Sequence, residues 1–168
     1  VVKEPVELFD IMPTIMELSN LPIKHNHFAK SLVSQLNGMK GDKKRTVFAE
    51  GGYNKNEPNC FEGYENRKND VTRMQGHQYY PKGKQQQEMP ESVCRSVMAR
   101  TLTHKLIYRS QGTNELYDMK NDPNELINLY YKDDIKKIRD SLEKKLLKWY
   151  LDTSDVTPQD EHPRDFPF

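Results

Sequence analysis

The sequence predicts an α+β fold in which a small antiparallel sheet of about four strands is packed by a long C-terminal helix. Two observations carry this prediction. Four short runs have the composition or alternation of strands and mostly follow one another through short connections, which antiparallel pairing allows. The segment at residues 135–150 then repeats apolar residues at the spacing of an amphipathic helix.

The first element is a short helix over residues 8–18, with apolar residues at helical spacing over a broad side. Asp10 can cap its start, and Pro13 is tolerable because it lies within the first turn. Asn20 and Pro22 follow as stop signals, since asparagine is one of the few residue types at ease with positive φ. The apolar residues are Leu8, Ile11, Met12, Ile15, Met16 and Leu18.

The four predicted strands lie in the middle of the chain. Residues 46–50 form a buried strand that ends at two glycines. Residues 92–101 and 105–109 form two more runs, separated by a turn at residues 102–104. Residues 115–118 alternate polar and apolar side chains, as the end of a strand does.

The stretch ELYDMKNDPNELINL at residues 115–129 combines several acidic residues with one proline. Asp122 has the position of an N-cap, Pro123 fills the first helical position, and Glu125 lies three residues after the cap, as in a capping box. We therefore predict a strand end, a turn and a helix start, in preference to a carboxylate pair for acid–base chemistry.

The clearest helix covers residues 135–150, where one stripe is apolar and the opposite side is charged. Asp133 and Asp134 precede it and suit the positive end of a helix dipole, which we favour over a metal site. The tail at residues 152–168 contains three prolines and is expected to be irregular. The apolar stripe consists of Ile135, Ile138, Leu142, Leu146 and Trp149.

Composition restricts the function classes. Only 35% of the 168 residues are apolar, so either the chain contains a large polar loop or its apolar faces belong against another domain. Lys plus Arg (26) nearly balances Asp plus Glu (25), which predicts no nucleic-acid partner, and no apolar stretch is long enough for a membrane span. The basic run at residues 40–45 is interpreted as a solvated loop. The abrupt start at Val1 leads us to expect a piece of a longer protein.

Residues 51–91 form a long polar segment with few aliphatic residues and four tyrosines. Such a segment is either a mobile polar loop or a surface for polar ligands, and both interpretations stay open. His77 is the histidine best placed to touch a ligand. The tyrosines are Tyr53, Tyr64, Tyr79 and Tyr80.

A search for reaction chemistry finds none in these residues alone. His25 and His27 lie on one side of an extended stretch, but a third metal ligand at a convincing spacing is missing, so we interpret them as surface residues. Cys60 and Cys94 do not make a disulfide framework or a zinc site by themselves. The sequence contains no nucleophile elbow, phosphate-binding glycine loop or zinc-protease motif.

Several separated stretches match the motifs of one family in order. Asp10-Ile-Met-Pro13-Thr14 is similar to an Asp-x-x-Pro-Thr helix, with Asn20 where Gly is usual, and residues 28–32 are similar to Gly-Arg-Ser-Leu, with Ala29 in place of Gly. The set continues with residues 47–50, Arg100-Thr101, Lys105-Leu106, Glu115-Leu-Tyr-Asp118, Asp122-Pro123-x-Glu125 and Asn128-Leu129. Together they resemble the C-terminal part of sulfatases in the alkaline-phosphatase-like superfamily, over about residues 6–50 and 93–157.

This resemblance implies that the reaction centre lies elsewhere. The family's nucleophile is a formylglycine made from the Cys or Ser of a C/S-x-P/A-x-R motif, and its calcium is held by upstream residues. Cys60 is followed by Phe61 and Cys94 by Arg95, so neither fits the motif, and the family's Asp-His-Gly metal segment is absent. We expect no catalytic residue, metal ligand or cofactor in this chain, with calcium and formylglycine in the intact enzyme, and no activity of the chain alone.

The resemblance also implies a division into three parts. Residues 1–45 would be the end of the catalytic domain and a connector, with the N-terminal helix belonging to that domain. Residues 46–151 would be the C-terminal subdomain with its polar loop at 51–91, and residues 152–168 the irregular tail. The implied partners are the protein's own N-terminal catalytic domain and a sulfate ester, with a sulfated glycan as candidate. The residues expected to recognise the leaving group are His77, Tyr79, Tyr53 and Lys82.

Two alternatives remain. A phosphonate monoester or phosphodiester hydrolase of the same superfamily would share this C-terminal layout. A stand-alone glycan or protein binding module would use the tyrosine-rich segment without any enzyme attached.

Overall fold

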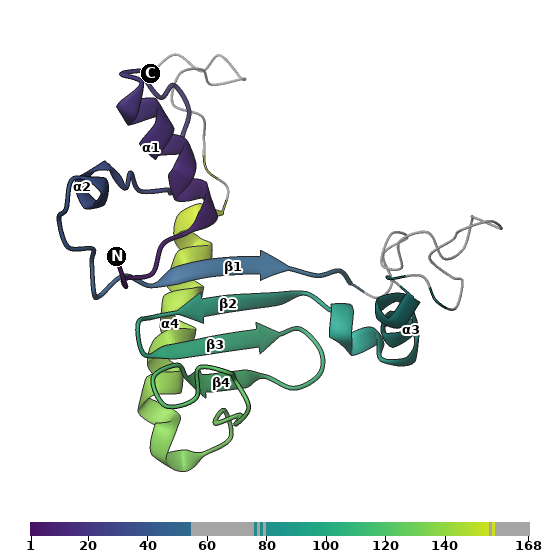
Figure 1. The fold of residues 1–168 in the computed structure, drawn as a ribbon. Coiled ribbons are helices and arrows are strands. Elements are labelled where there is room, and N and C mark those ends of the chain that lie inside the picture. The colour runs from purple at the N-terminus through teal and green to yellow at the C-terminus, as the bar shows by residue number, and fades with distance from the viewer. Residues whose placement is uncertain (55–75, 77, 79, 155, 157–168) are drawn as a thin grey trace, which may run out of the picture.

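A computed structural model describes residues 1–54, 76, 78, 80–154 and 156. Its centre is an antiparallel sheet of four strands in the order β1-β2-β3-β4, crossed on one face by the helix α4 (Figure 1). The predicted α+β fold is confirmed. The strands are β1 (Val47–Gly51), β2 (Ser96–Arg100), β3 (His104–Arg109) and β4 (Glu115–Asp118), and the helices are α1 (Ile11–Leu18), α2 (Val33–Leu36), α3 (Tyr80–Glu88) and α4 (Lys136–Thr153).

The core forms where α4 lies across the sheet. The strand register places Phe48, Ala99, Leu106 and Leu116 side by side in one row across the four strands. Leu142 and Leu146 of α4 are buried in the same hydrophobic cluster, and Trp149 stacks on Phe48 with ring centroids 5.1 Å apart and planes at 11°. The apolar stripe predicted for residues 135–150 therefore faces the sheet, as its periodicity indicates.

The outer edge of β4 is covered by the chain that follows it. The amide of Leu116 donates to Oδ1 of Asn128 at 3.1 Å, and the amide of Leu129 donates to the Leu116 carbonyl at 2.8 Å. Asn128 also donates from Nδ2 to the carbonyl of Asn114 at 2.9 Å. This pairing satisfies polar groups that an open edge strand would leave available for aggregation.

The predicted helix start at Asp122 is wrong. The Asp122 carboxylate instead closes a turn, because it accepts from the amides of Leu126 at 3.0 Å and Ile127 at 2.8 Å. Glu125 adopts a left-handed φ of 59°, which a right-handed helix cannot accommodate, and its carboxylate binds Nζ of Lys105 at 2.6 Å. The long-range ion pair therefore replaces the capping box.

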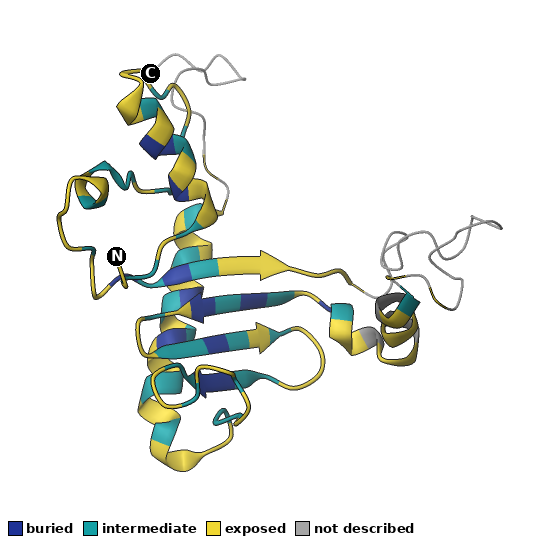
Figure 2. Cartoon of the chain, viewed as in Figure 1, coloured by how far each residue is buried: buried dark blue, intermediate teal, exposed yellow. Residues whose placement is uncertain are grey.

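The helix predicted over residues 8–18 is present, with its first turn, Leu8–Asp10, as a 3-10 helix before α1. Asn20 has the expected positive φ, at 53°. Asp10 helps to cap the start of the helix as expected, because it is the N3 residue of a capping box and its Oδ2 accepts from the amide of Glu7 at 2.8 Å. Its carboxylate also binds the amide of Lys30 and the side chain of Arg45, which are distant in sequence. Figure 2 shows that α1 projects from the sheet with much of its surface exposed.

The segment at residues 51–91, expected to be a polar loop, ends in the helix α3 and a short 3-10 helix at Pro90–Val93. Tyr53 pairs with Cys94 in an isolated bridge, so both described ends of the segment meet at one end of the sheet. Gly52 makes this possible, because a Cβ there would lie 2.2 Å from the Cys94 carbonyl oxygen. Of the helices in the described residues, none combines the length and apolar character of a membrane span.

Candidate functional site

The side chain of Arg45 forms two ion pairs in the N-terminal region. Its Nη2 lies 2.7 Å from Oε2 of Glu7, and its Nη1 lies 2.7 Å from Oδ2 of Asp10. Arg45 is 7% exposed and Asp10 fully buried. We call these three residues the Arg45 cluster.

The Arg45 cluster ties three chain segments together. The Asp10 carboxylate also accepts from the amide of Lys30 at 2.8 Å, and Oε1 of Glu7 accepts from the amide of Phe48 in β1 at 2.8 Å. Thr14 extends the link, because its hydroxyl donates to the Asp10 carbonyl and accepts from the amide of Leu32 at 2.9 Å. The Asp-x-x-Pro-Thr motif thus joins α1 both to residues 30–32 and to the sheet.

The charges of the Arg45 cluster are mutually stabilised. Burial alone would raise the pKa of Asp10, but hydrogen bonds from Arg45, Lys30 and Glu7 together with the charge of Arg45 outweigh it and lower that pKa. The hydrogen bond to Asp10 is the main cause that raises the pKa of Arg45. Asp10 and Arg45 therefore stay ionised near neutral pH, and their ion pair acts as a structural clamp.

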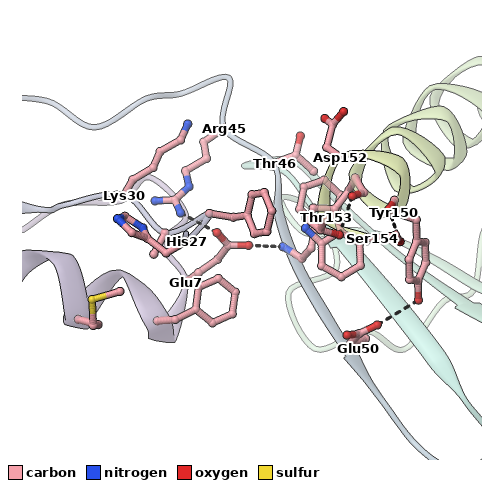
Figure 3. A pocket seen from close by; sticks show the side chains of 16 residues that line it. Glu7, His27, Lys30, Arg45, Thr46, Glu50, Tyr150, Asp152, Thr153 and Ser154 are labelled. Carbon is pink, nitrogen blue, oxygen red and sulfur yellow. Dashed lines mark hydrogen bonds and ion pairs between the residues drawn. The ribbon is translucent and has the colours of Figure 1, made fainter. Parts of the chain in front are cut away.

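A cavity of about 740 Å³ opens beside the Arg45 cluster, between the N-terminal segment and the C-terminal end of α4 (Figure 3). Phe9 and Phe28 line one side, and the stacked Phe48 and Trp149 line the other. Its acids are engaged: Glu7 in the cluster, Glu50 with the Tyr150 hydroxyl at 3.3 Å, and Asp152 with Lys148 at 2.8 Å. These features suit the binding of an apolar surface better than acid–base chemistry.

The structure leaves the predicted recognition residues untested. His77 and Tyr79 lie outside the described residues, and so does the side chain of Lys82, although its backbone belongs to α3. Tyr53 is described, 37% exposed and located just after β1.

The part of the chain that the structure describes offers no donor set for calcium, since no three His, Cys, Asp or Glu residues gather in it. The rings of His25 and His27 lie edge to face with centroids 6.2 Å apart. Cys94 is buried, and its Sγ donates to the Gln111 carbonyl at 3.0 Å, a packing role that does not suit a formylglycine precursor. Cys60 lies outside the described residues.

Sequence reasoning missed the Arg45 cluster. Arg45 closes the basic run at residues 40–45, whose neighbours Lys43 and Lys44 are exposed as expected of a solvated loop. The available signal was position, because Arg45 lies just before β1, whose first residue, Val47, is buried. The expectation that the whole strand is buried is wrong, since its last three residues are exposed.

Several solved structures share the fold of this chain. It matches a phosphonate monoester hydrolase from Silicibacter pomeroyi with a TM-score of 0.62 and 18% identity, covering 91% of this chain and 26% of that one. It matches a putative sulfatase from Bacteroides thetaiotaomicron VPI-5482 with a TM-score of 0.55 and 23% identity, covering 92% and 27%.

A third match is a protein solved in complex with its substrate D-glucosamine-2-N,6-O-disulfate, with a TM-score of 0.56, 20% identity, and coverage of 91% and 25%. The chain thus spans about a quarter of the length of these structures. Its fold is that of the corresponding part of these structures.

The family model described as N-sulphoglucosamine sulphohydrolase, C-terminal, matches residues 61–151, more than half of the chain. The chain therefore belongs to this family of sulfatase C-terminal domains, and the resemblance seen in its motifs is confirmed. A search among curated proteins gave no match.

Proposed function

We propose that this chain is the C-terminal supporting subdomain of a sulfuric ester hydrolase and works only together with a catalytic domain in the rest of the polypeptide. The family match to sulphohydrolases supports a sulfate ester over a phosphonate ester as substrate. In this proposal calcium and the formylglycine nucleophile belong to the catalytic domain, and residues 1–45 connect that domain to the subdomain at residues 46–151.

One observation carries the supporting role. Four apolar residues of the N-terminal helix, which we call the outer stripe, lie on one side of it and are 49–82% exposed: Leu8, Ile11, Ile15 and Leu18. The Arg45 cluster holds Asp10 on the other side of the same helix, fully buried. Burying a large aliphatic side chain contributes about 1.5–3 kcal/mol, so a row of four presents a strong surface for docking. The catalytic domain is its proposed occupant.

The proposed substrate is a sulfated saccharide related to glucosamine. The family takes its name from N-sulphoglucosamine, and one structural neighbour was solved with a disulfated glucosamine. His77, Tyr79, Tyr53 and Lys82 are the residues proposed to contact the leaving group. The location of Tyr53, immediately after β1 at the end of the sheet, supports a place for this segment beside the substrate.

The intact polypeptide tests this function directly. We expect it to release sulfate from N-sulfated glucosamine or glucosamine 6-sulfate, and to lose that activity when the Cys of an upstream Cys-x-Pro-x-Arg motif is changed to Ala. The double variant His77→Ala, Tyr79→Ala should raise KM for the saccharide. Faster hydrolysis of a phosphonate monoester would instead favour the phosphonate hydrolase, and the lack of any hydrolysis would favour a binding module.

A further inference from the structure

A second cavity, of about 550 Å³, lies at the end of the sheet where β1 stops and β2 begins. We call it the sheet-end pocket. Figure 1 shows that α4 crosses the sheet away from this end and leaves it uncovered. Its lining includes Glu50, Gly52, Arg95, Tyr108, Ser110 and Tyr150.

The strand register explains why these residues meet. Glu50 pairs with Val97, and Val97 pairs with Tyr108, so these residues form a row two positions along the strands from the core row at Phe48 and on the same face. The amide of Ser110 donates to the Arg95 carbonyl at 2.8 Å, so these two residues begin the following row. Because side chains alternate along a strand, Arg95 shares the α4 face with Val97.

The helix α4 stops covering the sheet beside the sheet-end pocket. Trp149 lies on the core row, whereas the neighbouring Tyr150 reaches Glu50 with its hydroxyl at 3.3 Å. Tyr150 is 39% exposed and Tyr108 is 43% exposed, and Arg95 is also exposed. The lining of the pocket therefore includes two tyrosines and one arginine, all three exposed.

Two charged residues of the pocket, Glu50 and Arg95, affect the pKa of Tyr150. Burial, followed by the charge of Glu50 and its hydrogen bond, raises the pKa of Tyr150, while the positive charge of Arg95 opposes this rise. The phenol thus stays protonated at neutral pH and serves as a hydrogen-bond donor. Tyr150 thus lies within the influence of both an anion, Glu50, and a cation, Arg95.

This combination has a definite ligand chemistry. A guanidinium presents a planar set of donors that matches the oxygens of an oxyanion in bidentate geometry. Phenol rings offer flat apolar faces, and serine hydroxyls, a carboxylate and phenol groups hydrogen-bond to hydroxyls. A cavity of this size accommodates a small ligand.

We propose that the sheet-end pocket is a subsite for a sulfated sugar unit, in which Arg95 binds the sulfate, the rings of Tyr108 and Tyr150 pack on the sugar, and Glu50 and Ser110 bind its hydroxyls. This inference rests on the proposed sulfatase function and adds to it a binding site outside residues 51–91. The described ends of that segment join the sheet here, since the Tyr53 amide donates to the Val93 carbonyl at 2.8 Å and the Arg95 amide to the Tyr53 carbonyl at 3.1 Å.

The test compares two substrates of the intact enzyme: a glucosamine disaccharide sulfated on both units, so that one sulfate can be hydrolysed while the other reaches the subsite, and a small aryl sulfate. Arg95→Ala should raise KM for the disaccharide about tenfold more than KM for the aryl sulfate, because one charge-assisted contact is lost. Arg95→Lys should recover part of the difference. Tyr108→Ala should weaken disaccharide binding, and Tyr108→Phe should weaken it less because the ring remains.

The matched control is Arg100→Ala, an exposed arginine on the opposite face of the same strand, which should leave KM for both substrates at the wild-type value. Equal KM changes for the two substrates in Arg95→Ala, or no change in either, would overturn the subsite while leaving the sulfatase function standing. A wild-type enzyme that hydrolyses neither substrate would overturn both. The unsulfated disaccharide and the product that keeps one sulfate can also be compared as inhibitors. Equal inhibition constants for the two would show that Arg95 does not recognise the sulfate.

Discussion

The sheet with α4 and the N-terminal region around α1 are stabilised in opposite ways. In the first, apolar residues face inward: Leu106 and Leu116 are fully buried under α4. In the second, the interior is ionic, with Arg45 and Asp10 at its centre, while the outer stripe faces outward. A buried ion pair gives little net stability but fixes geometry, because its partners are costly to separate. The difference indicates that the sheet is packed for its own stability, whereas α1 is held in position for another surface.

The largest effect is expected from breaking the Arg45 cluster. Arg45→Met leaves the buried Asp10 carboxylate without its cation, which should destabilise this region by about 3–5 kcal/mol. Hydrogen exchange should show faster exchange of the Lys30 and Leu32 amides. Lys43→Met, in the same basic run but exposed, is the control and should change stability by less than about 0.5 kcal/mol. Unchanged exchange in Arg45→Met would remove the contrast between the two regions.

The second effect tests the core. Leu106→Ala should cost about 2–5 kcal/mol of unfolding free energy, because it leaves a cavity under α4. Denaturant unfolding followed by Trp149 fluorescence measures it. The control Leu147→Ala changes a residue of α4 that is 62% exposed, and it should cost less than about 0.5 kcal/mol of unfolding free energy. Similar costs for the two variants would mean that α4 is not packed on the sheet as described.

Lowering the pH should affect the N-terminal region around Asp10 before it affects the sheet core. The pKa of Asp10 is lowered below 3.8 in the folded chain, so the folded form binds a proton less readily than the unfolded form. The contribution of Asp10 to stability is therefore fully present above about pH 4 and is lost as the pH falls toward its lowered pKa. As the pH falls below about 4, the amide of Lys30 should lose protection from hydrogen exchange before the amide of Leu106 does. In Asp10→Asn this loss should be weaker, and the same loss in that variant would assign it to another group.

The smallest effect on the chain itself is expected at the outer stripe. Ile15→Ser should change the stability of the chain by less than about 0.5 kcal/mol, since Ile15 is 55% exposed. In the intact protein the same change should cost more, because Ile15 would there be buried against the catalytic domain. Thermal unfolding of both forms makes the comparison. An equally small effect in the intact protein would leave the outer stripe without its proposed partner.

The features that the sequence predicted correctly are those with a local cause. Periodicity alone places α4 and the strands, and the positive φ of Asn20 follows from its residue type. The helix start at Asp122 failed because Glu125 pairs with Lys105, which lies 20 residues away. Arg45 escaped notice for the same reason, since its partner Asp10 is 35 residues distant.

The candidate site was harder to predict from the sequence than the fold. His77, Tyr79 and the side chain of Lys82 lie outside the described residues, so their role stays a prediction. The sheet-end pocket depends on strand register, which brings Arg95, Tyr108 and Tyr150 together from three elements. The spacing of residues within a single segment cannot predict such a site.

Sulfate release by the purified 168-residue chain, with the intact polypeptide assayed in parallel on the same sulfated glucosamine, tests the central claim most directly. We predict release by the intact polypeptide and none by the chain, because the proposed function assigns the reactive aldehyde and its metal to the catalytic domain. Sulfate release by the chain alone would show that it holds its own reaction centre and would contradict the supporting role.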